Sequence, residues 1–412
     1  MSSPLLRGVG RALLSILFWI AGPCWAGDSI EDRATLLTPD AAVAAALDVH
    51  PSLLAAELDL ARARGAAAEA ALLLSNPTLA AETTQDGARG GAELTLSVSL
   101  RGAGWAERSW TRAELAAAVA GHTRTRLATA AETRSLYAGA SVAAGKVRVA
   151  LEGLELATRL RHAVTRLQEE GEVSTLELRL ARLAEVQAAA ELLAAREAEA
   201  EALQLLAGAI GQAVRSEDLV LDPLAAAPEA GSKVAGTRSD VVAAADHLRA
   251  AEAELRLQRA RSLPAVELGV FAEHEDDQTF WGPSVGLELP LFRHNQANRA
   301  HASAGIDRAE AALASVTARA HTELATAEQR VADAVALSSV LQADPITEAR
   351  AALASIESGY LAGEIDLPSA VLLQAEVLDG ETAALDLLGH IARARIDLLV
   401  ASEDPMLLGG AS

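Results

Sequence analysis

The sequence predicts a mainly helical chain with a small β part that crosses a membrane. Alanine and leucine dominate, whereas aromatic residues make up only 3% of the 412 residues. This composition is typical of long helices rather than of a compact core rich in aromatic side chains. Long stretches also lack proline, and four short segments alternate between apolar and polar residues.

Proline is absent between Pro77 and Pro223, and again between Pro290 and Pro345. Because proline breaks helices, these stretches permit very long ones. The segment Ala103–Glu170 carries Leu, Val and Ala at three- and four-residue spacings, and a continuous helix of this length would span about 100 Å.

Three further segments complete the helical pattern. A return helix is expected over Glu172–Gly211, and the pattern recurs over Asn295–Ala343 and Ile365–Ser402. Helices so rich in small residues are expected to pack closely, in the manner of a coiled coil. The helices alone would also fit a soluble helical bundle.

Four segments of about nine residues or fewer follow a period of two, which predicts strands with one apolar and one polar face. They are Ala92–Leu100, Val266–Glu273, Ser284–Leu291 and, more weakly, Thr78–Thr84. Turn-rich connections at 85–91 and 275–282 join them into two hairpins, 78–100 and 265–291. The alternation places Leu94, Leu96, Leu287 and their neighbours on the apolar side. It places Glu93, Glu267, Glu273 and Glu288 on the polar side.

The strands are close to the length that a tilted strand needs to cross a bilayer. Six aromatic residues lie in or beside them, as in the aromatic girdles of outer-membrane barrels: Trp105, Trp110, Phe271, Phe280, Trp281 and Phe292. Four strands cannot close a barrel, and open edges are not tolerated in lipid. Three chains would supply a shared barrel of twelve strands. The alternative is a pair of soluble hairpins that cap a bundle.

The chain is also duplicated. The segment Leu96–Arg108 aligns with Leu287–Arg299 at an offset of 191, and Gly171-Glu-Val aligns with Gly363-Glu-Ile at an offset of 192. We therefore expect a first repeat over 27–230, with a helical reversal near 171. The second repeat is expected over 231–412, with a reversal near 363.

The first 26 residues have the pattern of a secretory signal peptide. Arg7 and Arg11 precede an apolar run over Leu13–Ala21, and Cys24-Trp-Ala26 forms a small-x-small cleavage site. Cys24 could instead be lipidated, although Pro23 makes a poor match to a lipidation motif. Cleavage after Ala26 would remove the only cysteine and with it any thiol chemistry.

Several functions are excluded by composition and motifs. A net charge of −21 at pH 7 argues against a nucleic-acid partner. No nucleophile, phosphate loop or pair of catalytic carboxylates stands out. The segment Gly102-Ala-Gly104 lacks the third glycine of a dinucleotide site. We expect no enzyme activity, no cofactor and no bound metal.

At these residues the chain resembles the TolC-like outer-membrane factors of Gram-negative efflux and secretion systems. Leu289-Pro-Leu-Phe292 is similar to the family signature at the end of the fourth strand. The opening segments Leu37–Val43 and Val49–Leu53 are like the start of the family. Arg293-His-Asn-Gln296 is similar to the "RNQG" form of the CzcC-type heavy-metal branch, with Ala297 in place of the usual glycine.

The resemblance implies a homotrimeric channel in the outer membrane that extends into the periplasm. Such a channel docks on a periplasmic adaptor and an RND-type inner-membrane pump, and performs no chemistry on its cargo. The implied cargo is divalent heavy-metal cations, while drug efflux and type I protein secretion remain alternatives within the family. A soluble periplasmic coiled-coil adaptor or scaffold is the alternative of a different class.

Glycines at the two predicted reversals suit tight turns, and the resemblance makes these turns the periplasmic tip. The residues expected to contact the adaptor are Leu167, Gly171, Glu172, Val173, Leu361, Gly363, Glu364 and Ile365. Glu177 and Tyr360 lie where the family holds its tip closed, so we expect a hydrogen bond between them to act as a gate. Residues 274–277, His-Glu-Asp-Asp, are metal-binding types, but a solvated acidic loop is the simpler interpretation.

Overall fold

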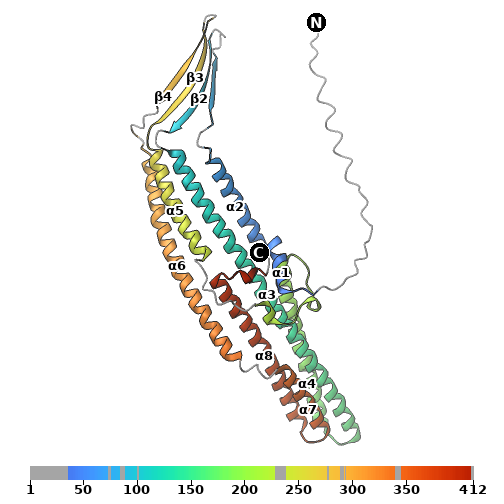
Figure 1. Cartoon of the computed structure of the whole chain (residues 1–412). Coiled ribbons are helices and arrows are strands. Elements are labelled where there is room, and N and C mark those ends of the chain that lie inside the picture. Colours follow the sequence, from blue (N-terminus) through green and yellow to red (C-terminus); the bar gives the residue numbers. More distant parts are fainter. Residues whose placement is uncertain are drawn as a thin grey trace, which may run out of the picture. The chain divides into compact units, whose positions relative to one another are not determined.

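The chain is mainly helical, as predicted, and carries one four-stranded antiparallel sheet (Figure 1). The computed structural model describes residues 36–72, 76–83, 89–99, 102–227, 238–275, 278–287, 292, 294–338 and 345–409. The predicted signal peptide over 1–26 lies outside the described residues.

The same order of helix, strand hairpin and long helices occurs twice along the chain. The first half contains α1 (Pro39–Val49), α2 (Pro51–Glu69), β1 (Thr78–Thr83), β2 (Arg89–Ser99), α3 (Ala103–Glu170), α4 (Thr175–Ile210) and the short helices η1 (Ser216–Asp218) and η2 (Pro223–Ala226). The second half contains α5 (Ser239–Ala260), β3 (Ala265–Glu275), β4 (Gln278–Leu287), α6 (Gln296–Ser338), α7 (Pro345–Leu361), α8 (Leu367–Ser402) and η4 (Pro405–Leu408).

The longest helix, α3, has the predicted bounds. It has 68 residues and would span about 100 Å if straight. It begins after Gly102 and ends at Gly171, and both glycines have positive φ. In the second half, two helices, α6 and α7, stand where the first half has one. Pro345 begins α7, as expected of a residue that favours the first turn of a helix.

The sheet has the order β1-β2-β3-β4, so each predicted hairpin forms and β2 pairs with β3 between them. The predicted turns over 85–91 and 275–282 are both wrong in extent, because β2 already begins at Arg89, β3 continues to Glu275 and β4 begins at Gln278. Gly282 belongs to β4 rather than to a turn. A Cβ atom there would lie 3.3 Å from the Phe271 ring, so glycine leaves room for this cross-strand side chain.

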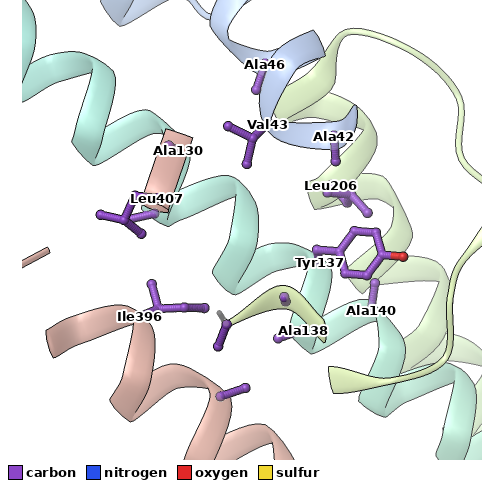
Figure 2. Close-up of a cluster of buried hydrophobic side chains, with 14 of the residues drawn as sticks. Ala42, Val43, Ala46, Ala130, Tyr137, Ala138, Ala140, Leu206, Ile396 and Leu407 are labelled. Carbon is purple, nitrogen blue, oxygen red and sulfur yellow. The ribbon is translucent and has the colours of Figure 1, made fainter. Parts of the chain in front are cut away.

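Helix α3 is the element against which the other helices pack, since α1, α2, α4, α5, α7 and α8 all contact it. Side chains from α1, α3, α4 and α8 meet in one buried cluster (Figure 2). Small residues dominate the α3 side of this cluster, which lets the helix backbones approach closely. Within the described residues, no single helix is long and apolar enough to cross a membrane. The bent pair α1 and α2 passes that test only when taken together.

Arg134 of α3 is the main polar anchor of this cluster, and it is only 2% exposed. Its guanidinium donates to the backbone oxygen atoms of Leu407 at 2.9 Å and Ala226 at 3.1 Å. It also donates to the Asp40 carboxylate at 2.5 Å. A single side chain therefore ties the C-terminal turn, η2 and α1 to the middle of α3.

Tyr137 extends this anchor by one helical turn. Its hydroxyl donates to the Leu37 oxygen at 2.6 Å and accepts from the Val220 amide at 2.9 Å. Leu37 also forms an isolated parallel bridge with Leu219. The segments before α1 and after α4 are thus held against α3 by hydrogen bonds that are largely shielded from water.

Replacement of Arg134 by Met should destabilise the fold by about 3 kcal/mol or more, because several buried carbonyl groups would lose their donor. Chemical denaturation of the detergent-solubilised protein measures this change. Arg62→Met is the matched control, since Arg62 is largely exposed and, among the described residues, pairs with nearby Asp59 alone; its effect should stay within about 0.5 kcal/mol. Equal stability of the two variants would contradict the role of Arg134.

Candidate functional site: strand faces and helical tips

The strand register separates the side chains of the sheet into two faces. Thr95 pairs with Gly269, Ser97 with Glu267 and Gly91 with Glu273. Residues that pair directly across strands lie on the same face, so Glu93, Glu267 and Glu273 share one face, as predicted from the alternation. Glu82 joins them, because it pairs with Gly91. The fourth predicted glutamate, Glu288, lies outside the described residues.

Glycines on this polar face make room for its longer side chains. The Ser284 hydroxyl donates to the Glu93 carboxylate at 2.6 Å. A Cβ atom on Gly269 would meet that hydroxyl, and a Cβ atom on Gly286 would lie 3.2 Å from the Glu267 carboxylate. The carboxylates therefore lean across neighbouring glycines and remain on a face that carries hydroxyl groups beside them.

The opposite face carries large apolar side chains that remain widely exposed in the described chain. Trp281 is 81% exposed, Val285 is 73% exposed and Leu79 is 70% exposed. Four further residues on this face are about half exposed: Leu94, Leu268, Val270 and Leu287. An exposed apolar surface of this size marks an interaction with lipid or with protein.

Two of the three predicted girdle residues in the described strands do not lie on the apolar face. Only Trp281 lies on the apolar face among the aromatics of the described strands. Phe271 pairs with Glu93 and Phe280 pairs with Glu273, so both rings lie on the polar face. The period of two explains the difference, since neighbours such as Phe280 and Trp281 must point to opposite faces.

The two helical reversals are built in the same way. Gly171 and Gly363 have φ values of +81° and +73°. The amide of the next residue donates to a carbonyl five residues earlier in both turns, from Glu172 to Leu167 at 2.9 Å and from Glu364 to Gly359 at 2.9 Å. These are Schellman turns, in which a left-handed glycine ends the helix.

Each return helix is then capped three residues after its glycine. The Ser174 side chain accepts from the Glu177 amide, and the Glu177 carboxylate accepts from the Ser174 amide at 2.9 Å, which is a capping box. Asp366 caps α8 by accepting from the Ser369 amide at 3.0 Å. Hydrogen bonds from Ser369 hold the pKa of the Asp366 carboxyl below its usual value.

The eight predicted tip residues divide by exposure. Leu167, Val173 and Ile365 pack against a buried cluster formed by α3, α4, α7 and α8. Gly171, Glu172, Leu361, Gly363 and Glu364 are exposed. The first group stabilises the tip from within, and the second group forms its outer surface.

The predicted gate residues lie near each other without a hydrogen bond in this chain. The Tyr360 hydroxyl is buried and has no partner among the described residues. Burial raises the pKa of this hydroxyl, and the nearby Glu177 carboxylate raises the pKa further. One oxygen of that carboxylate is engaged in the capping box.

Exposed leucines near the tips were missed by the sequence interpretation. Leu176 and Leu183 of α4 are 63% and 65% exposed, and Leu372 of α8 is 65% exposed. The seven-residue spacing of Leu176 and Leu183 is a signal that could have found the first pair, since it places both on one side of a helix.

The predicted acidic loop gives no metal cluster in the part of the chain that is described. There, no group of three or more His, Cys, Asp or Glu side chains could hold a metal ion. His274 lies 3.0 Å from the Thr279 hydroxyl. Asp276 and Asp277 lie outside the described residues.

No protein-family model matches the sequence, and no curated protein matches it either. Solved structures do match. The outer membrane protein VceC of Vibrio cholerae is 21% identical, with a TM-score of 0.69 over 88% of this chain and 95% of its own. The CmeC outer membrane channel of Campylobacter jejuni is 16% identical, with a TM-score of 0.74 over 88% and 85%. The open MtrE outer membrane channel of Neisseria gonorrhoeae is 21% identical, with a TM-score of 0.65 over 89% and 88%.

The chain has the fold of outer-membrane channels. The likeness extends over most of the length of each neighbour. It confirms the predicted fold class, a helical body with a small four-stranded β part. It also supports the resemblance to the TolC-like family, without distinguishing a heavy-metal branch.

Replacement of Gly363 by Val should loosen the α7–α8 turn, because a β-branched residue at positive φ costs about 1–2 kcal/mol. Amide hydrogen exchange at 361–366 should accelerate by roughly 5- to 30-fold. Gly380→Val is the matched control, since this α8 glycine has no positive φ and open space around its Cβ position. Unchanged exchange in Gly363→Val would show that the turn does not need glycine.

Proposed function

We propose that three copies of this chain form an outer-membrane channel, the exit duct of a tripartite efflux system. The two-faced sheet is the observation that carries this proposal. Its apolar face is widely exposed, whereas its polar face carries glutamates and hydroxyl groups. A strand that faces lipid on one side and water on the other needs this pattern.

The outer edges of the sheet support assembly from several copies. Within the described chain, β1 pairs only with β2 and β4 pairs only with β3. Each edge strand leaves a row of backbone groups without strand partners, which a second copy can pair. Three copies supply twelve strands, which is within the range of known membrane barrels.

The helices offer matching edges for the same assembly. Helices α2, α3, α5 and α6 contact one another in that order (Figure 1). Leu54 and Leu58 are about half exposed on α2, the helix at one end of this row. A neighbouring copy that pairs its β4 with β1 would bring its α6 beside this surface. The long helices would then continue the barrel as a tunnel into the periplasm.

Partners are proposed from the same architecture. The tips at Gly171 and Gly363 would lie at the far end of the tunnel from the sheet. Helix α3 runs from β2 to Gly171, and α6 and α7 lie between β4 and Gly363. A periplasmic adaptor would contact the exposed tip residues Glu172, Leu361 and Glu364, and an RND-type inner-membrane pump would deliver the cargo.

We propose cations as the cargo, and divalent heavy-metal ions as the specific class. Glu82, Glu93, Glu267 and Glu273 would face the lumen of the barrel, where carboxylates favour cation passage. The motif at 293–296 does not support a particular cargo, because its described part has a structural role. Asn295 has a φ of 55° and donates its side-chain amide to Gln258 of α5, which fixes the start of α6.

Planar-bilayer recording of the purified protein tests the proposal. The expected result is a conducting trimer from the outer-membrane fraction whose reversal potential indicates a preference for cations. Glu93→Gln with Glu273→Gln should reduce that preference without loss of trimer. A monomer that never conducts would contradict the channel, and an unchanged ion preference would contradict the role of the glutamates.

Replacement of Leu96 by Arg should impair assembly, because a cation on the lipid face costs about 2–4 kcal/mol per chain near the bilayer midplane. Thr95→Arg is the matched control, since Thr95 is the neighbouring residue on the polar face. The yield of trimer in the outer-membrane fraction measures both effects. Equal yields from the two variants would refute the assignment of the faces.

Replacement of Tyr360 by Phe should raise the conductance of the closed channel if Tyr360 donates to Glu177 when the trimer closes. Such a bond contributes about 1.5–3 kcal/mol per copy. Glu177→Gln should act more weakly, because an amide still accepts, and Ser174→Ala controls for loss of the capping box alone. A Tyr360→Phe channel with wild-type conductance would show that this latch does not exist.

A further inference from the structure

Helices α3 and α8 approach each other closely at three positions where a glycine on one helix faces a large side chain on the other. A Cβ atom on Gly153 of α3 would lie 2.8 Å from Leu378 of α8, and one on Gly145 would lie 3.1 Å from Leu385. In the opposite direction, Val142 of α3 fills the space beside Gly389 of α8. Each large side chain therefore occupies the space left by a glycine on the facing helix.

Glu381 lies in the middle of this contact, between Leu378 and Leu385 along α8. Its side chain is only 1% exposed, and neither carboxylate oxygen has a hydrogen-bond partner among the described residues. Gln374, which lies seven residues earlier on α8, is a buried polar residue that does have a hydrogen-bond partner. Its side-chain amide donates to the Gly153 oxygen at 2.9 Å.

The charged groups that face Glu381 come from α3 and α7. Glu152 and Arg148 lie on α3, and Arg350 lies on α7. Arg350 donates to Glu152 at 3.0 Å. Burial raises the pKa of the Glu381 carboxyl, Glu152 raises this pKa further, and Arg350 and Arg148 oppose the shift. An ionised carboxylate in this position would be desolvated without a hydrogen bond, and the two arginines would offset only part of that cost.

We propose that Glu381 is a proton-binding site that controls the packing of α8 against α3. The neutral acid permits the close contact, and loss of the proton drives the carboxylate towards water and separates the two helices. Because α8 begins at the α7–α8 tip, this separation displaces that tip. The consequence for conduction rests on the proposed channel function.

The direction of the pH dependence follows from the raised pKa. In the separated state the pKa of the Glu381 carboxyl is that of an ordinary exposed glutamate. The packed state binds the proton more tightly, so its stability is full below that value and falls as pH rises. The decrease in the stability of the packed state levels off above the pKa that Glu381 has in that state. The α3–α8 contact is therefore tightest in acid and weakens towards alkaline pH.

Infrared difference spectroscopy on the intact trimer tests the protonation directly. A carboxylic acid and a carboxylate absorb in separate regions, so the acid band of Glu381 should persist to higher pH than that of an exposed glutamate. The band should be lost in Glu381→Gln and retained in Glu376→Gln, which changes an exposed glutamate of the same helix. A band of equal strength in all three proteins would overturn the proposal.

Conductance between about pH 5 and about pH 8 tests the consequence for the tip. The wild-type channel and Glu376→Gln should open more readily as pH rises, whereas Glu381→Gln should lose this dependence and stay closed. Glu381→Asp keeps a titratable group and should keep the dependence, which guards against a simple folding defect. A conducting wild-type channel with the same pH profile as Glu381→Gln would contradict the switch and leave the channel itself intact. Absence of any conducting trimer would instead contradict the proposed function.

Discussion

The close approach of other helices to α3 determines how the helical part of this chain can pack. Six other helices contact α3, and its buried surface consists largely of alanine, with glycine, threonine and serine beside it. A larger residue at Gly145 or Gly153 would meet Leu385 or Leu378 of α8. The low aromatic content of the chain follows from this geometry, because bulky rings would hold the helices apart. Arg134 and Tyr137 add the polar bonds that small side chains cannot supply.

The close packing around α3 also keeps the buried anchor at Arg134 apart from the tip at Gly363. The close contact of α3 with α8 lies between the anchor at Arg134 and the tip at Gly363, so a change at Glu381 can reach the tip without disturbing the anchor. The sheet is stabilised differently, because its apolar face stays widely exposed within the described part of the chain. In the proposed trimer, lipid covers that face and neighbouring copies cover the strand edges.

Much of this could be predicted from the sequence, because the signals were local and periodic. The absence of proline over 78–222 and the glycines at 102 and 171 set the bounds of α3 to the residue. Alternation placed Glu93, Glu267 and Glu273 on one face, and the register confirms it. The turn over 275–282 failed for a physical reason: Gly282 accommodates the Phe271 ring from the facing strand, and a sequence cannot distinguish such a glycine from one in a turn.

The remaining features depend on contacts between distant residues. Arg134 bonds to groups 92 and 273 residues away, and nothing in its neighbourhood along the chain indicates burial. The burial of Glu381 is equally hard to predict, since it stands among other charged residues of an ordinary helical pattern. It is buried because glycines on α3 bring α3 and α8 close together. The exposed leucines at 176 and 183 carry a readable spacing, but spacing alone does not show which side of α4 faces its neighbour.

In the proposed trimer, the chain completes its sheet only with copies of itself. Electron cryomicroscopy of the detergent-solubilised protein tests this most directly, because it resolves strand partners at both edges. We expect three copies around one axis, with β4 of each copy hydrogen-bonded to β1 of the next in a closed ring of twelve strands. A particle in which β1 or β4 remains unpaired, or is covered by a segment of the same chain, would contradict it.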